Sequence, residues 1–459
     1  MTRRLVAAGL SVLLWTGGAA ADPPSLTNSR YEEDYSALRS PAARTGAFWE
    51  PFKAIPLASA DGVWLDTGAE LRLRYESVRN SGWGQDQPAN DRYLLWRALP
   101  YADLTLGPQL RLFGQLVAAD ALGKDGPLAP PDADRLDLLQ GFGELRLPLG
   151  ETDATIRIGR RMLAFGSERL IGYRYGPNVP RSFDMASAAI SAGPWRAEAV
   201  YGRPVRNSPE PFDDQHAPDR RLAAVYGTYA LDARSGIDAY WIGLRTHGTS
   251  FDQGTADERR HTLGTRLFGR SGPWDWNWEA MGQVGRFGGG DIRAWSLATE
   301  TGYRWADAWL GPRLGLKANI ASGDHDPSDP DLGTFDPLFP KGKYFGELTP
   351  IGPYNLINLH PTLDLDLSGG FGLGLAAVAY WRESGRDGVY DVTGNLLRPG
   401  TGSDARYLGT QGEIVLSYSN GRTFEAMASY SVFRPGAFIE DTGPARTIHF
   451  VGLEAVLKF

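Results

Sequence analysis

Basic side chains recur at alternate positions in many segments of this 459-residue chain, and most of them are arginines. The guanidinium group of arginine can contact a carboxylate through two parallel hydrogen bonds. A surface lined with such groups would therefore attract an anion that carries carboxylates. The residues that alternation places on one polar face are the basic Arg72, Arg74, Arg97, Arg111, Arg146, Arg157, Arg313, Lys317 and Arg382, accompanied by the acidic Glu70, Asp103, Glu144 and Asp364.

A second group of arginines is concentrated in one segment. Between residues 157 and 184 there are six arginines against only Glu168 and Asp184, although the whole chain has a formal net charge of −7. Arg160 and Arg181 lie in this segment and join the candidates, but alternation does not decide which face they occupy. Several weak, equivalent sites would attract a polyanion and still release it, whereas one strong site would hold it.

The same arginines have a structural interpretation that remains open for each of them taken singly. Arginine and acidic side chains on neighbouring strands can pair as ladders that stiffen a sheet. One such contact at 4 Å contributes about 1 kcal/mol in water and about 4 kcal/mol at an effective dielectric constant of 20. For the set as a whole we favour anion selectivity.

An acidic stretch offers candidates for a different chemistry. Asp324, Asp326, Asp329 and Asp331 are hard oxygen ligands that suit calcium, but their intervals do not match an EF-hand and two prolines interrupt them. A solvated acidic loop is the commoner explanation. His325 stands between two of these aspartates and resembles part of a catalytic dyad, yet neither a G-x-S-x-G nor an H-E-x-x-H motif accompanies it. The sequence therefore predicts no enzyme, no firm metal site and no cofactor.

Composition excludes further classes of function. The chain has no cysteine, which removes disulfides, thiolate metal sites and cysteine nucleophiles. Six scattered histidines make a zinc enzyme a poor fit. An acidic chain is also a poor electrostatic match for nucleic acid.

The elements that must position the candidates are strands, because polarity alternates with a period of two residues. In the segment 272–285, Trp274, Trp276 and Trp278 share one face, while Asp275 and Asn277 share the other. A strand separates these sets completely, whereas a helix would mix them. Similar patterns occur over residues 63–76, 94–106, 109–119, 310–321, 371–382, 408–419, 423–433 and 446–459.

Two β architectures would explain such strands. In a soluble sandwich the apolar face would be the core, but a chain of this length would need several cores, and no linker divides it. In a transmembrane barrel the apolar face meets lipid, and the 14 tryptophans and 19 tyrosines form girdles at the two interfaces. We therefore predict an all-β, antiparallel transmembrane barrel.

The connections support the barrel because their lengths alternate. Short connections are expected near residues 106–109, 148–153, 191–194, 232–236, 270–273, 305–308, 368–370 and 419–421. Long polar ones are expected at 79–90, 120–134, 163–180, 203–219, 246–258, 321–350, 383–404 and 434–445, and only the connection at 286–290 breaks the alternation. Short periplasmic turns and long extracellular loops are typical of bacterial outer-membrane barrels, and this pattern gives about 18 strands.

The two ends of the chain suggest export and membrane assembly. Residues 1–21 combine two arginines, an apolar stretch and a final run of alanines, which is the order of a secretory signal peptide. Residues 22–60 show little alternation and are expected to form a periplasmic tail or plug, and residues 61–459 the barrel. The terminal Phe459 completes an amphipathic last strand of the kind that barrel-assembly machinery recognises. The predicted location is the outer membrane of a Gram-negative-type cell.

Several motifs resemble those of the alginate export family of bacterial outer-membrane porins. They include RYEEDYSALR (30–39), RALPYADLTLG (97–107), IGRRMLAFGSERLIGYRYGPNVPRSFD (158–184) and SGDHDPSDPDLGTFDPLFP (322–340). The resemblance implies a single, monomeric 18-stranded barrel that exports an anionic polysaccharide through an arginine-lined constriction. It also implies that the loop after residue 321 caps the extracellular mouth.

The expected function is therefore a passive channel for an alginate-like polyuronate. A porin for the uptake of small organic anions would use the same arginines, and a barrel hydrolase is the alternative from another class. Outer-membrane lipid, lipopolysaccharide and periplasmic secretion proteins are the expected partners, and nucleic acid is not.

Overall fold

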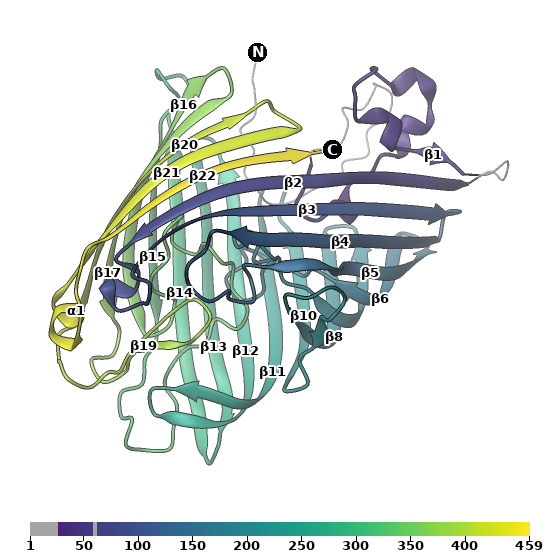
Figure 1. The fold of residues 1–459 in the computed structure, drawn as a ribbon. Coiled ribbons are helices and arrows are strands. Elements are labelled where there is room, and N and C mark those ends of the chain that lie inside the picture. Colours follow the sequence, from purple (N-terminus) through teal and green to yellow (C-terminus); the bar gives the residue numbers. More distant parts are fainter. Residues whose placement is uncertain (1–25, 58–61) are drawn as a thin grey trace.

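The alternating segments build one closed antiparallel barrel, shown in Figure 1, in a computed structural model that describes residues 26–57 and 62–459. Eighteen strands form its wall. The last strand pairs with the first, with Lys458 opposite Glu70, and this pairing closes the barrel. The wall strands are β2 (Val63–Arg79), β3 (Asn90–Leu106), β4 (Leu110–Leu122), β5 (Asp134–Leu149), β6 (Thr152–Arg161), β7 (Phe183–Ala192), β8 (Trp195–Arg206), β10 (Arg220–Ala230), β11 (Gly236–Phe251), β12 (Gly254–Ser271), β13 (Trp274–Phe287), β14 (Gly290–Arg304), β15 (Arg313–Ala321), β16 (Leu356–Ser368), β17 (Phe371–Arg382), β20 (Tyr407–Ser419), β21 (Phe424–Pro435) and β22 (Ile448–Lys458).

The two faces of the wall differ as the sequence predicts. On β2, Leu71 and Leu73 are 45% and 55% exposed on the outside, whereas the intervening Arg72 is 2% exposed and faces the interior. Apolar side chains on the outside suit lipid, and polar side chains on the inside suit water. The fold class predicted from alternation is confirmed.

Aromatic side chains gather on the outer surface beside the short turns. Trp274 and Trp305 both pack on Tyr303, with ring centroids 4.8 and 4.5 Å apart. Trp195 packs on Tyr229 in the same way at 4.6 Å. Amphipathic rings at the end of the apolar band are typical of the membrane interface.

The alternation of short turns and long loops is confirmed, with two corrections. The connection expected to be long between residues 246 and 258 is a two-residue turn, because β11 runs to Phe251 and β12 begins at Gly254. The two strands pair through a register shift between Thr246 and Thr249, and at their tip Phe251 packs against Phe287 and Tyr390 with ring centroids 5.5 and 6.2 Å apart. The other tip residues are mostly polar and the register shift interrupts the alternation, so the sequence indicated a loop. The connection expected to be short at Trp305 extends to residue 312.

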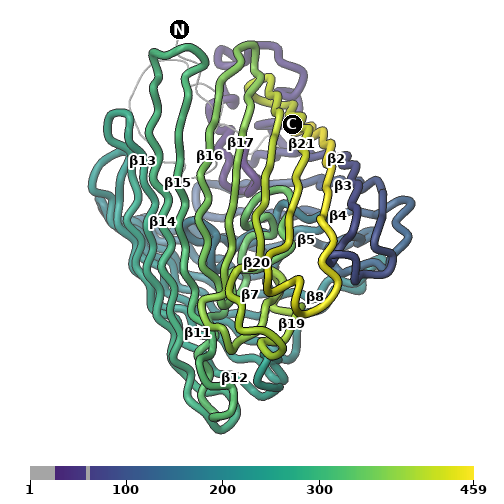
Figure 2. The backbone as a smooth tube through the Cα atoms, turned by 90° about the vertical axis from the view of Figure 1, so that its left-hand side faces the viewer, coloured from purple at the N-terminus to yellow at the C-terminus, as the bar shows by residue number. Residues whose placement is uncertain are grey.

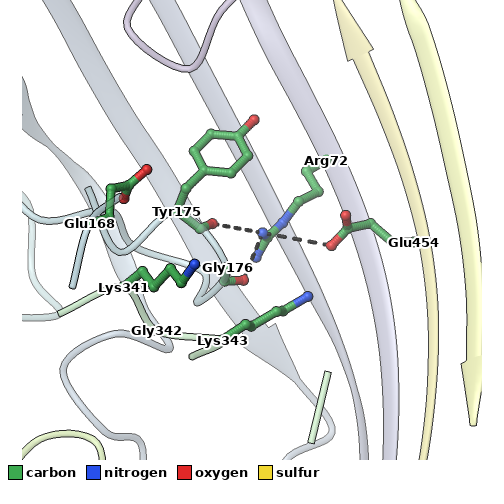
Figure 3. Close-up of a pocket in the computed structure, with 8 residues that line it drawn as sticks. All are labelled: Arg72, Glu168, Tyr175, Gly176, Lys341, Gly342, Lys343 and Glu454. Carbon is green, nitrogen blue, oxygen red and sulfur yellow. Dashed lines mark hydrogen bonds and ion pairs between the residues drawn. The ribbon is translucent and has the colours of Figure 1, made fainter. Parts of the chain in front are cut away.

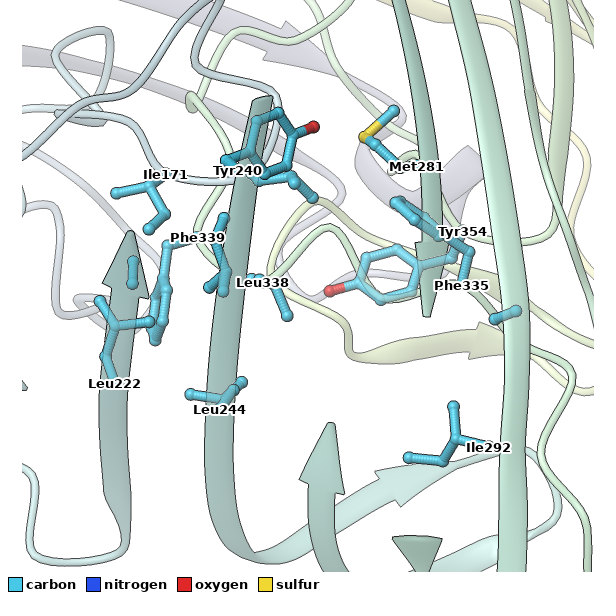
Figure 4. Packing of buried hydrophobic residues seen from close by; sticks show 14 of the residues in the cluster. Ile171, Leu222, Tyr240, Leu244, Met281, Ile292, Phe335, Leu338, Phe339 and Tyr354 are labelled. Atoms are coloured by element: carbon cyan, nitrogen blue, oxygen red, sulfur yellow. The ribbon is translucent and has the colours of Figure 1, made fainter. Parts of the chain in front are cut away.

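Two long loops fold back into the barrel instead of standing outside it. Loop 162–182 and loop 322–355 meet at a parallel bridge between Ile171 and Phe339, and the amide of Gly172 donates to the Phe339 carbonyl at 2.9 Å. Figure 4 shows how these residues pack against the inner wall, where Leu222 and Leu244 extend from β10 and β11. Apolar contacts thus hold both loops in the interior.

The N-terminal residues of the described chain also enter the barrel. Residues 26–57 contain the 3₁₀ turns η1 (Arg30–Glu32), η2 (Ser36–Arg39), η3 (Pro41–Ala43) and η4 (Glu50–Phe52), followed by β1 (Ile55–Pro56). Tyr31 packs on Phe142 at 5.2 Å and on Phe113 at 5.8 Å, both on the inner face of the wall. Figure 2 shows that this segment and the C-terminus lie toward the same end of the barrel.

The remaining elements are small. β9 (Gln215–His216) pairs antiparallel with the end of β8, β18 (Val389–Tyr390) pairs with β19 (Leu396–Arg398), and η5 (Ser81–Gly84) and α1 (Ala437–Thr442) lie in loops. Within the described residues, no helix is both long and apolar enough to cross a bilayer. The signal peptide expected at residues 1–21 lies outside the described residues.

Candidate functional site

The interior of the barrel at the level of the two folded-in loops brings together most of the charged candidates. Arg97 of β3 donates from Nη2 to Oε1 of Glu70 on β2 at 2.6 Å, and both side chains are buried. The Tyr175 ring lies 4.4 Å from the Arg97 guanidinium carbon, and its hydroxyl donates to the other oxygen of Glu70. Arg97 is therefore neutralised and enclosed by loop 162–182.

Arg72 and Arg74 are also held by protein groups. Arg72 donates to the carbonyl oxygens of Gly176 at 2.9 Å and Pro177 at 3.1 Å, and it lies 3.7 Å from Glu454. Arg74 contacts three carboxylates, namely those of Glu76 at 2.5 Å, Glu347 at 2.9 Å and Glu454 at 3.0 Å. These two arginines fasten the inner loops to the wall.

Nearer the short turns the candidates form ladders between strands. Arg111 donates from Nε to Asp103 at 2.7 Å, and Arg157 donates from Nε to Glu144 at 2.5 Å. Arg146, whose side chain is 52% exposed, also reaches Glu144 at 2.7 Å. The pairing interpretation describes these contacts well.

Arg313 completes the ladders on the opposite wall. It donates from Nε to Asp275 at 2.9 Å and lies 3.3 Å from Asp364. It also lies 3.8 Å from Glu300, so its carboxylate partners come from β13, β14 and β16 and it links four strands.

Arg382 and Arg160 lie apart from this interior group. Arg382 donates to the carbonyl oxygens of Ser403 and Ala405 at 2.8 and 2.6 Å, and so anchors the loop 383–406. Arg160 follows the alternation of Ile158, which is 65% exposed on the outside of β6, and it pairs with Asp184 at 2.8 Å. The next residue, Arg161, lies on the inward face of β6 and donates to Glu198 at 2.5 Å.

A smaller set of interior cations forms no direct ion pair with a carboxylate among the described residues. Lys317 of β15 stands opposite Glu300 of β14 in the strand register without an ion pair or hydrogen bond there, and the Lys341 ammonium group lies 5.9 Å from the Tyr344 ring. Arg181 donates to the Pro340 carbonyl at 3.3 Å and lies over the Phe339 ring. Arg174 donates weakly to Asn207, at 3.5 Å.

These cations lie close enough to repel one another. Burial, followed by repulsion from Lys317 and Arg169, lowers the pKa of Lys341 to about 8. Arg174 and Arg220 in turn act electrostatically on Arg181. Glu168 attracts both Lys341 and Arg181 and so offsets part of the positive charge that these cations share.

A cavity of 240 Å³ opens beside these groups, between the wall and both inner loops (Figure 3). Arg72 and Glu454 line it from the wall, and Glu168, Tyr175, Lys341 and Lys343 line it from the loops. Lys343 is paired with Glu347 at 2.6 Å, whereas Lys341 forms no direct ion pair among the described residues and is attracted electrostatically by the nearby Glu168. The cavity is smaller than the roughly 300 to 1,000 Å³ of typical ligand pockets.

The acidic loop after residue 321 uses its carboxylates internally. Asp324 accepts from the amide of Asp326 at 2.9 Å, Asp326 from the Ser328 hydroxyl at 2.6 Å, and Asp329 from the amide of Asp331 at 2.8 Å. Asp331 accepts from the amide of Asp291. Within the described residues these four carboxylates do not converge on a common point. The weaker calcium hypothesis for this loop gains no support from the geometry.

His325 has a different neighbour from the one the dyad interpretation requires. Its Nε2 lies 3.3 Å from the Glu383 carboxylate, and its side chain is largely exposed. The adjacent aspartates are occupied by backbone amides, as described above.

Sequence reasoning missed several interior cations, above all Lys341, Arg174 and Arg220. Two of them lie in loops, where no periodic pattern indicates which way a side chain points. The local excess of arginine between residues 157 and 184 was the one signal that included Arg174.

Comparison with known proteins identifies the lineage of this barrel. A family model described as alginate export matches residues 63–453, which is most of the chain. The chain belongs to the alginate export family. The resemblance inferred from motifs is thereby confirmed. No curated protein matches this family member.

Solved structures share the fold at low sequence identity. OccK2 (OpdF) of Pseudomonas aeruginosa, solved in complex with glucuronate, is 14% identical with a TM-score of 0.56, over 86% of this chain and 98% of that one. OpdK of the same species, solved with vanillate, is 12% identical with a TM-score of 0.56 and the same coverage. A BenF-like porin from Pseudomonas fluorescens Pf-5 is 11% identical with a TM-score of 0.57, over 86% and 99%. Family and fold together support a channel in the Gram-negative outer membrane.

Proposed function

We propose that this alginate export family member is a passive, anion-selective channel that exports an acidic polysaccharide of the polyuronate type. The observation that carries the proposal is the set of interior cations that form no direct ion pair with a carboxylate of the described chain, Lys317, Lys341 and Arg181, although Glu168 lies near the last two. Most wall arginines are neutralised by acidic neighbours, so they contribute less to selectivity than their number suggests. We expect these three cations to attract the anion.

The expected binding energy of a carboxylate at each of these cations suits a polyanion that moves through the channel better than one that is held in place. A carboxylate at 4 Å from one cation gains about 1 kcal/mol in water and about 4 kcal/mol at an effective dielectric constant of 20. Cations spread over the inner loops and β15 would offer a polyanion several comparable sites in sequence. Such a series lets a chain of carboxylates move from one site to the next.

Passage of a polymer requires the inner loops to move. The 240 Å³ cavity accommodates one small anion and not an extended chain. Loop 162–182 is tied to buried Arg72 and Arg97 through its carbonyl oxygens. Loop 322–355 is joined to the wall in part through Glu347, which Arg74 and Lys343 share. We expect loop 322–355 to be the element that opens.

Single-channel recording in planar bilayers tests the selectivity. Wild-type channels should pass chloride in preference to potassium, and Lys341→Gln and Arg181→Gln should each shift the reversal potential toward the cation value. Arg293→Gln is the matched control, because Arg293 is an exposed charge on the outward face of β14. Cation preference in the wild-type channel, or equal shifts in all three variants, would contradict the proposal.

A second function, uptake of small organic anions, has its own support. The cavity is of a size for a single small anion, and the fold is that of OccK2 solved with glucuronate and OpdK solved with vanillate. The two functions differ in the ligand that blocks ion current. Block by polyuronate at carboxylate concentrations where monomeric glucuronate has no effect supports export, and the reverse order supports uptake.

The barrel fold indicates how the protein would lie in the cell envelope. We expect a monomer whose outer face contacts outer-membrane lipid and lipopolysaccharide. Its N-terminal segment faces the periplasm, where secretion partners would deliver the polymer.

A further inference from the structure

Three carboxylates converge at the extracellular end of β5, outside the site described above. Asp134 and Asp137 belong to β5, and Asp214 belongs to the loop 207–219 that joins β8 to β10. One oxygen of each lies within 4.8 Å of the other two. Calcium binds oxygens at about 2.3 to 2.6 Å, so two ligands on opposite sides of one ion stand about 5 Å apart. The spacing fits a single shared ion.

Asp134 points into this cluster without a partner of its own. Its side chain is 0% exposed, and neither carboxylate oxygen forms a hydrogen bond with any described residue. One buried oxygen of the neighbouring Asp213 is likewise without a partner in the described chain. An unpaired buried carboxylate is costly unless it is neutralised or binds a metal.

The other two carboxylates are fixed in orientation by hydrogen bonds. Asp137 accepts from the amide of Asp214 at 3.0 Å, and Asp214 accepts from the amide of Ser208 at 2.7 Å and from the Asn207 side chain at 2.9 Å. Each retains further lone pairs for a cation. The three residues therefore offer carboxylate oxygens as ligands for a cation, and the Asp134 carboxylate has no other partner among the described residues.

The positive charge nearby does not balance the cluster. Arg160 lies 3.6 Å from Asp137, but its closest contact is with Asp184 at 2.8 Å. Arg135 extends to Asp120 and Glu210 instead. Arg160 is therefore the one nearby arginine that the four carboxylates of the described chain share, namely those of Asp134, Asp137, Asp213 and Asp214.

We propose that Asp134, Asp137 and Asp214 bind one calcium ion that fastens loop 207–219 to the rim of the barrel. Calcium accepts irregular shells of six to eight oxygens, including carbonyls and waters, whereas magnesium demands a near-ideal octahedron. The loop already lies against β5, because the amide of Phe212 donates to the Leu136 carbonyl at 2.9 Å. The ion would add a bond between β5 and the loop that carries Asn207, the partner of Arg174.

Calcium titration by calorimetry tests the site on the full chain, refolded into detergent from denatured protein so that no lipopolysaccharide contributes ions. Wild-type protein should bind one calcium ion, and Asp134→Asn should weaken binding by roughly 10-fold or more. Asp326→Asn is the matched control, because Asp326 lies in the acidic loop and bonds to Ser328. Absence of one-to-one binding, or equal affinities in wild type and Asp134→Asn, would overturn the proposal.

Thermal unfolding gives a second readout of calcium binding, measured separately from the calorimetric titration. With a chelator present, Asp134→Asn should melt higher than wild type, since it removes an unpaired buried charge. With calcium in excess the order should reverse, because only the wild type gains from the ion. An unchanged order in both conditions would show that the carboxylates do not hold calcium.

Discussion

Arg97 and Glu70 form a buried ion pair on adjacent strands, with 2.6 Å between Nη2 and Oε1, and loop 162–182 covers both side chains. The pair occupies the part of the interior where the sequence predicted an arginine free to meet substrate. Arg97 is instead paired within the protein, whereas Lys341 and Arg181 nearby form no direct ion pair with a carboxylate of the described chain. Stability and selectivity therefore depend on different cations.

Removing Arg97 should destabilise the barrel more than it changes selectivity. Arg97→Gln leaves Glu70 as an uncompensated buried charge, a loss of about 3 to 5 kcal/mol in free energy of unfolding. Urea-dependent folding into lipid vesicles measures it. The double variant Glu70→Gln/Arg97→Gln should recover part of the loss, and a large shift in reversal potential with unchanged stability would contradict this assignment.

Anion selectivity should fall as pH rises through the pKa of Lys341, which burial and the neighbouring cations Lys317 and Arg169 lower to about 8. Below that pH the ammonium group is charged, and above it the interior loses one positive charge. The permeability ratio of chloride to potassium should therefore decline between about pH 7 and pH 9. Lys341→Arg should abolish this decline, because arginine stays charged. A decline of the same size in Lys341→Arg would exclude Lys341 as its source.

The loop 383–406 should be more firmly packed in mild acid than at neutral pH. Burial raises the pKa of Asp387 from 3.8 to about 6, although Thr334 and Tyr390 donate to it. The folded state then holds the proton between these two values while the unfolded state loses it. Stability is therefore greatest below this window, falls as pH rises through it by up to about 3 kcal/mol, and is constant above.

Hydrogen exchange at the amides that donate to Asp387, those of Asp324 and Gly388, measures this effect after correction for intrinsic rates. Asp387→Asn should show no such dependence, since an amide does not titrate. Protection that rises between pH 4 and pH 6 would refute the assignment.

Truncating Tyr31 should loosen the N-terminal segment. Tyr31 packs edge-on against Phe113 and Phe142, and its carbonyl accepts from Arg111 at 2.6 Å. Tyr31→Ala removes the aromatic contacts at a cost of about 3 kcal/mol to docking of the segment. Trypsin should then cleave faster at Arg39 and Arg44, and conductance should rise. Phe48→Ala, at an exposed position on the same segment, serves as the control.

Alternation in the sequence was sufficient to predict the wall. Leu71 and Leu73 face outward and the intervening Arg72 faces inward. Polarity that alternates with a period of two residues indicates a strand and not a helix. The end of the β11–β12 hairpin escaped this reasoning. Beyond Thr246 the register shifts and most residues are polar, although Phe251 packs inward on Phe287 and Tyr390, so the residues at the tip were predicted as a long loop.

The candidate site was also predictable only in part. Arg72, Arg74 and Arg97 were predicted to face inward, and they do so with at most 2% of their surface exposed. Their partners could not be predicted, because Glu347, Glu454 and the carbonyls of residues 176 and 177 lie far away along the chain or in loops without periodicity.

The sequence by itself determined an inside-out β-barrel, since the order of apolar and polar residues along each strand is a local property that every backbone pairing must respect. Only the tertiary structure decided which charges are cancelled and which are left over. That balance depends on distances of about 3 Å between residues hundreds of positions apart, and on two loops whose apolar side chains draw them back into the barrel.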